Sequence, residues 1–172
     1  HGRLAYERGR LAEAQTCYEH QAEPKDNAES LFLQADVAVE TGDLSRHARI
    51  VERALSLLGD VFGSSAYVGR LAKYAHLTGE SRWLLEARRR MDAALDRMPN
   101  TAKMRMHAQT CRTWVAVASG DAAAARELYK ELQSSEQTVM TAGPVMNSAL
   151  LARTAGLLDK AVDHFQVAID RH

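Results

Sequence analysis

Five glycines recur along the 172-residue chain at nearly regular intervals, and each is preceded by alanine at a fixed distance. The glycines are 33, 37, 41 and 36 residues apart, with alanine four positions before each and a second small residue seven positions before four of them. The glycines are Gly9, Gly42, Gly79, Gly120 and Gly156; the residues before them are Ala5, Ala38, Ala75, Ala116 and Ala152, and Ala35, Ala72, Thr113 and Ala149. Residues three apart share a helix face, so the repeat predicts helices that end at a glycine and carry a stripe of small residues.

A second helix is expected after each glycine, because small residues let two helices approach closely and glycine supplies the backbone freedom for the turn. Alanine and then tyrosine or phenylalanine follow three of the glycines at five and nine positions. The predicted first helices span 1–8, 27–41, 64–78, 101–119 and 144–155, and the second helices span 11–22, 44–58, 82–98, 121–134 and 158–171. These helices form units of about 1–24, 26–59, 64–99, 101–134 and 144–172, within a single repeat domain over 1–172.

Composition supports the same fold class. The chain holds 29 Ala and 19 Leu against 11 Val and 2 Ile, and the first two residues favour helices whereas the last two favour strands. An all-α protein is therefore predicted.

The sequence carries no known catalytic or phosphate-binding motif. Patterns such as G-x-x-x-x-G-K-[ST], H-E-x-x-H, G-x-S-x-G and C-x-x-C are absent, and the seven histidines include no pair at the spacing of metal ligands on a helix. We therefore expect no catalytic residues, no metal site and no cofactor. Cys17 and Cys111 are predicted to be small buried side chains in a reducing, cytoplasmic protein.

Charge balances overall but not locally. Lys and Arg number 22 and Asp and Glu number 22, which speaks against a protein that binds nucleic acid or an anionic membrane, and no apolar run is long enough to span a bilayer. Residues 13–43 nevertheless hold eight acidic and one basic residue, and 82–112 hold eight basic and three acidic. These regions are interpreted as solvated helix faces with pairs such as Glu86 with Arg90; a footprint for charged partners is the alternative.

The segments GLLDKAVDHFQVA (156–168) and GDAAAARELYKEL (120–132) resemble the tetratricopeptide (TPR) repeat. This resemblance implies a TPR-like α-solenoid, a right-handed superhelix of about five antiparallel helix pairs. Residues 115–171 are also similar to the repeat region of large bacterial signalling proteins, in which such repeats follow an NTPase coupled to a nucleotide cyclase or a LuxR-type DNA-binding domain. Proteins with TPR repeats usually bind other proteins, so no enzymatic activity is implied.

A solenoid presents its first helices along one concave wall, where the TPR family holds its ligands. We use the name first-helix wall for the residues three, six and ten positions before each repeat glycine. Its candidate binding residues are Arg3, Tyr6, Phe32, Asp36, Lys73, His76, Trp114 and Arg153. Lys73 and Asp36 are expected to be exposed, whereas Phe32, Trp114, Met146 and Leu150 have an alternative role as core residues that bridge adjacent repeats.

Two functions follow as expectations. The first is a non-catalytic protein-interaction and regulatory module of a cytoplasmic signalling or transcription-regulatory protein, which holds a protein or peptide segment or acts on neighbouring domains of its own chain. The alternative is a small-molecule sensor that controls an attached NTPase, cyclase or DNA-binding domain. The repeat pattern starts mid-unit and continues to the last residues, so the chain is expected to be a fragment of a longer array whose open apolar ends self-associate.

Overall fold

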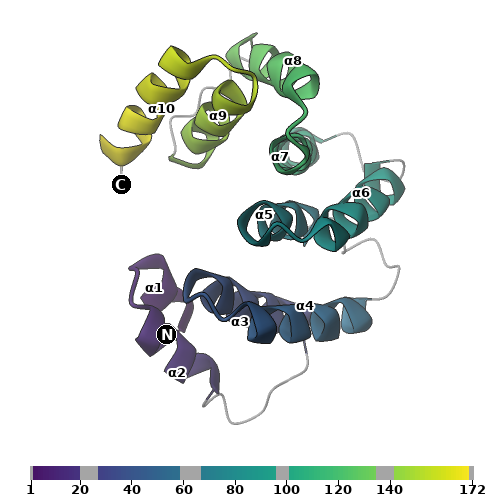
Figure 1. Ribbon diagram of the computed structural model, residues 1–172, viewed down its shortest axis with the longest axis vertical. Helices are drawn as coiled ribbons and strands as arrows, with labels where there is room; N and C mark the ends of the chain where they lie inside the picture. Colours follow the sequence, from purple (N-terminus) through teal and green to yellow (C-terminus); the bar gives the residue numbers. More distant parts are fainter. Residues whose placement is uncertain (1, 20–26, 59–66, 96–100, 135–141, 171–172) are drawn as a thin grey trace. The chain divides into compact units, whose positions relative to one another are not determined.

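The computed structural model describes residues 2–19, 27–58, 67–95, 101–134 and 142–170, and these ranges contain ten α-helices and no strand (Figure 1). The helices are α1 (Gly2–Glu7), α2 (Leu11–Glu19), α3 (Ala28–Glu40), α4 (Leu44–Leu58), α5 (Val68–Thr78), α6 (Ser81–Leu95), α7 (Ala102–Ser119), α8 (Ala122–Ser134), α9 (Ala142–Thr154) and α10 (Leu158–Asp170). The all-α prediction is confirmed, and each predicted helix has a counterpart. Helix α9 begins two residues before Pro144. The helix tolerates proline there because the first amides of a helix need no intrahelical acceptor.

The turn inside each pair is built on a glycine with positive φ. Gly9, Gly42, Gly79, Gly120 and Gly156 have φ between 64° and 79°, and no other described residue has a positive φ. Four turns share one pattern of hydrogen bonds. The glycine amide donates to the carbonyl oxygen three residues earlier, and the next amide donates to the carbonyl oxygen of the alanine four positions before the glycine. In the fourth pair, these bonds run from Gly120 N to Val117 O (3.2 Å) and from Asp121 N to Ala116 O (3.1 Å). This Schellman arrangement satisfies carbonyls at the helix end.

Gly120→Ala is expected to lower the free energy of unfolding by about 1–2 kcal/mol, because alanine resists the left-handed conformation. A β-carbon at Gly120 would meet no atom within 4 Å, so the whole effect is conformational. Urea unfolding measures it. Gly120→Asn is expected to lower the free energy of unfolding by less than Gly120→Ala does. Gly69→Ala is expected not to destabilise the chain, because Gly69 is a helical position without positive φ. Equal losses for Gly120→Ala and Gly69→Ala would contradict this account of the turn.

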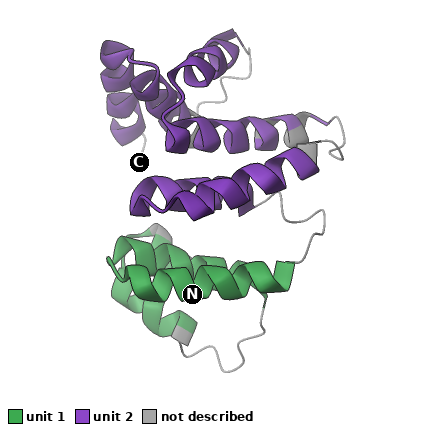
Figure 2. Ribbon diagram, turned by 45° about the vertical axis from the view of Figure 1, so that its right-hand side comes forward, with its two compact units in different colours: residues 1–64 green, residues 65–172 purple. Residues whose placement is uncertain are grey.

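The chain divides into two compact units, residues 1–64 and 65–172 (Figure 2). In unit 1, α1 packs on α2, α2 on α3, and α3 on α4. In unit 2, each first helix packs on its own second helix and on the next first helix, so that α5 contacts α7 and α7 contacts α9. The division falls between the second and third predicted helix pairs.

The stripe of small residues lies in the interior, as predicted. The five alanines four positions before the glycines are 0–7% exposed. The four small residues seven positions before the glycines have no exposed surface. On the second helices, Ala14, Ala125 and Ala161 are equally buried, and His47 takes the corresponding place in α4. Around the stripe of unit 2, Leu128, Leu150 and Leu151 join α7, α8 and α9 in one apolar cluster.

Candidate functional site

The structure divides the predicted first-helix wall into exposed, half-buried and buried members. His76 and Arg153 are exposed; Tyr6, Lys73 and Trp114 are half-buried. Phe32 and Asp36 are buried. The side chain of Arg3 lies outside the described residues.

Helix α3 corrects one expectation and favours one of two alternatives that the sequence left open. Asp36 was expected to be exposed and is 6% exposed, and Phe32 has no exposed surface, which favours its alternative role in the core. The physical reason is that residues 35–39 are all buried, and five successive residues cover the whole circumference of a helix. A wall position on this helix therefore offers little surface to a ligand.

In unit 2, the wall brings together side chains that are far apart in the sequence. The Arg153 guanidinium of α9 donates to Nε2 of His76 on α5 at 3.2 Å, across 77 positions of the chain. Guanidinium has no acceptor, so His76 must be neutral, with its proton on Nδ1. Both residues stand three positions before a repeat glycine, so the third and fifth pairs meet at equivalent positions.

We expect His76 to stay neutral at lower pH than an ordinary histidine. Partial burial of the imidazole, and then the positive charge of Arg153, lower its pKa below the usual 6.5. A histidine with a lowered pKa in the folded state stabilises the fold above the pKa of the unfolded chain, and this contribution is lost as the pH falls through 6.5 toward the folded pKa. An NMR titration of the imidazole should give a pKa below 6.5, and Arg153→Met should raise it part of the way back. A value that Arg153→Met does not change would contradict the contact.

Trp114 of α7 extends this surface along α5. A β-carbon at Gly69 would lie 3.6 Å from Cδ1 of Trp114, so the indole lies beside Gly69 of α5 at ordinary contact distance. Lys73 lies one turn after Gly69, and His76 follows it by three positions. Along α5 the wall therefore runs from Trp114 of α7, past Lys73, to His76 and its partner Arg153 of α9.

In unit 1, the wall residue Tyr6 makes a different polar contact. The Tyr6 hydroxyl of α1 donates to Oε1 of Glu40 on α3 at 2.5 Å. The first and second pairs are thus joined by a phenol and a carboxylate, whereas the wall of unit 2 carries cations.

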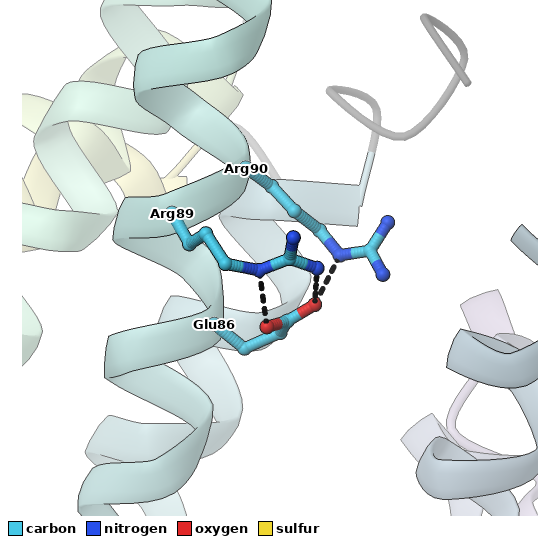
Figure 3. Close-up of polar contacts among 3 residues, drawn as sticks. All are labelled: Glu86, Arg89 and Arg90. Carbon is cyan, nitrogen blue, oxygen red and sulfur yellow. Dashed lines mark hydrogen bonds and ion pairs between the residues drawn. The ribbon is translucent and has the colours of Figure 1, made fainter. Parts of the chain in front are cut away.

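Three arginines of the basic stretch 82–112 form ion pairs with Glu86 of α6 or with Glu80 just before it. The predicted pair of Glu86 with Arg90 is among them (Figure 3). Arg90 is buried and its Nε contacts Oε1 of Glu86 at 2.5 Å, while Arg89 binds the same carboxylate through two nitrogens at 2.9 and 3.0 Å. The hydrogen bond from Arg89, together with Arg90, lowers the pKa of Glu86 against the opposing effect of burial. Arg82 pairs with Glu80 at 2.6 Å.

A groove that the sequence did not reveal lies between α6, α7 and α8. Its volume is about 330 Å³. Apolar residues and charged residues of both signs line it: Arg88, Met91, Arg112, Val115, Ala116, Ser119, Asp121, Ala124, Glu127, Leu128 and Glu131. Its arginines belong to the basic stretch, whose excess of positive charge was the available signal in the sequence.

The described residues offer little for chemistry. They contain no group of three or more His, Cys, Asp or Glu side chains that could hold a metal ion, and no helix among them has the length and hydropathy needed to cross a bilayer. Cys111 is buried, and burial raises the pKa of its thiol to about 11, so the thiol is protonated at neutral pH. Cys17 is half-buried.

The chain matches no family model, and a search of curated proteins finds no relative above the significance threshold. Function is therefore inferred from the residues and their geometry.

Proposed function

We propose that the chain is a non-catalytic interaction and regulatory module, made of TPR-like antiparallel helix pairs in a right-handed superhelix, which holds a protein or peptide segment on its first-helix wall. The observation that carries the proposal is the contact between His76 and Arg153. It supports a continuous wall, because α5, α7 and α9 also pack in that order and their small-residue stripes are buried.

The chemistry of this wall favours a particular kind of segment. Lys73 and Arg153 are the cations of the wall in unit 2, and the neutral His76 lies between them in the line of contacts. Half-buried Trp114 adds an aromatic surface beside Gly69. An extended peptide with carboxylates spaced along it, and one apolar side chain for the indole, matches these groups.

The setting we propose is a cytoplasmic signalling or transcription-regulatory protein. A segment held along α5, α7 and α9 touches three consecutive helix pairs, so its binding favours one spacing of those pairs over others. A bound partner, or a neighbouring domain of the same protein, thereby changes the conformational equilibrium of the module.

Selection of peptides from a displayed random library, with the purified chain as target, tests this function. We expect acidic peptides to be enriched, and their affinity to fall by about tenfold or more in Lys73→Ala/Arg153→Ala. The matched control, Lys130→Ala/Lys160→Ala, removes two exposed cations from the second helices α8 and α10 and is expected to bind like the parent chain.

Two outcomes would overturn the proposal. If the selected peptides bind Lys73→Ala/Arg153→Ala and the parent chain equally well, the first-helix wall is not the binding surface. Failure to enrich any peptide, together with a saturable thermal shift from one compound of a metabolite panel, would make the chain a small-molecule sensor instead.

A further inference from the structure

The groove between α6, α7 and α8 is bordered by charges of opposite sign that come from different helices. Its cations are Arg88 of α6 and Arg112 of α7, which are exposed and whose guanidinium groups form no hydrogen bond or ion pair with any described residue. Its carboxylates are those of Asp121, just before α8, and of Glu127 and Glu131 on α8. In the described part of the chain, the two signs therefore border one groove without pairing across it.

The carboxylates differ in how far they are already engaged. Asp121 accepts the amide of Ala124 at 3.0 Å and so caps the start of α8. Glu127 pairs with Lys130 at 2.8 Å, but the two side chains are 68% and 63% exposed, and such an exposed pair contributes little. The carboxylate of Glu131 has no hydrogen bond or ion pair with a described residue. Glu127 and Glu131 are thus the carboxylates that a ligand can engage at low cost.

The groove is small, and its remaining lining is apolar. Val115 and Leu128 are each 8% exposed, and Met91 beside them is half-buried. The volume of about 330 Å³ lies at the lower end of the range found for small-molecule sites. A ligand that fills it is therefore a small molecule with an apolar body rather than a helix or a folded domain.

We propose that this groove binds a short free peptide of about two apolar residues, with its carboxylate toward the two arginines and its ammonium toward Glu127 and Glu131. Guanidinium groups bind a carboxylate through paired hydrogen bonds, and an ammonium group donates to carboxylates. The apolar side chains of the peptide cover Val115 and Leu128.

Charge selects this class of ligand over simpler ones. An anion without a cationic group would face Glu127 and Glu131, and an amine without a carboxylate would face the two arginines, so a ligand with one sign of charge meets repulsion. A free α-amino acid carries both charges on one carbon atom. An extended dipeptide separates its termini by up to about 7 Å, which suits charges that border a groove without pairing across it.

None of the residues that line the groove belongs to the first-helix wall. The dipeptide site therefore goes beyond the function proposed above, and the two stand or fall separately.

An NMR titration of the isotope-labelled 172-residue chain with leucyl-leucine tests the site. We expect saturable changes of amide chemical shifts in α6, α7 and α8, with a Kd of about 1 mM or tighter. N-acetyl-leucyl-leucine and leucyl-leucine amide each lack one of the two charges, so each is expected to bind about tenfold more weakly. The absence of saturable changes up to about 10 mM, or equal affinity for all three compounds, would overturn the proposal.

Two variants assign each end of the ligand. Arg88→Gln/Arg112→Gln is expected to bind leucyl-leucine about tenfold more weakly and no better than its amide, while it still distinguishes the acetylated compound. Glu127→Gln/Glu131→Gln is expected to show the opposite loss of discrimination. All four positions are exposed, and circular dichroism checks that the variants fold.

The matched control is Arg8→Gln/Arg49→Gln, which removes two exposed cations from unit 1 and is expected to bind like the parent chain. If the arginine variant of the groove distinguishes leucyl-leucine from its amide as well as the parent chain does, the assignment of the carboxylate is wrong and the proposal fails. Lys73→Ala/Arg153→Ala is expected to keep dipeptide binding. If that variant binds the dipeptide and the peptides selected from the library as well as the parent chain does, only the function proposed above is removed.

Discussion

Phe32→Ala is expected to lower the free energy of unfolding by about 3–5 kcal/mol. Phe32 has no exposed surface, so alanine leaves a cavity in addition to the lost transfer of an aromatic ring from water. Urea unfolding followed by circular dichroism measures the loss. The position is informative because Phe32 lies ten residues before its repeat glycine, where the sequence also allowed a ligand-binding role.

Met146→Ala is the matched control. Met146 stands at the same repeat position in the fifth pair but is 39% exposed, so its truncation is expected to cost about 1 kcal/mol or less. Similar losses at Phe32 and Met146 would show that burial does not separate the two positions and would contradict the division of the wall into core and surface members.

Ala152→Leu and Ala75→Leu are each expected to lower the free energy of unfolding by about 1–3 kcal/mol through overpacking. Ala152 has no exposed surface and Ala75 is 7% exposed, and both stand on the stripe where a first helix packs on its neighbours. We expect the larger loss at Ala152. Thermal and urea unfolding of both variants give the measurement.

Ala123→Leu supplies the comparison for these variants, because Ala123 is an exposed residue within α8 and leucine is nearly as good a helix former as alanine. Its effect should stay within about 0.5 kcal/mol. Unchanged unfolding midpoints for Ala75→Leu and Ala152→Leu would mean that the repeat register, and every position counted from it, is misplaced.

The turns and the small-residue stripe were predictable because they depend on local backbone chemistry. A glycine such as Gly120 ends a helix with positive φ wherever the flanking residues are helical, and the alanine four positions earlier then accepts the closing hydrogen bond. The pair of Glu86 with Arg90 was predictable for the same reason, since residues four apart on a helix are neighbours.

The surfaces were less predictable, because they depend on which helices lie nearby rather than on spacing along one helix. Asp36 has the polarity of an exposed residue, yet it lies in the part of α3 that is buried on all sides. The Arg126 guanidinium of α8 donates to the carbonyl of Ala155, which is 29 positions away, at 3.1 Å. The groove likewise forms from three helices and has no counterpart in the pattern of any one of them.

The most direct test of the binding wall is to map a selected peptide on the chain by NMR. Amide chemical shifts of the isotope-labelled chain are recorded as the tightest peptide from the library is added. We predict that the changes concentrate in α5, α7 and α9 around Lys73, His76 and Arg153, and that the imidazole signals of His76 move with them. Changes confined to α6, α8 and α10, with the first helices unaffected, would contradict the account.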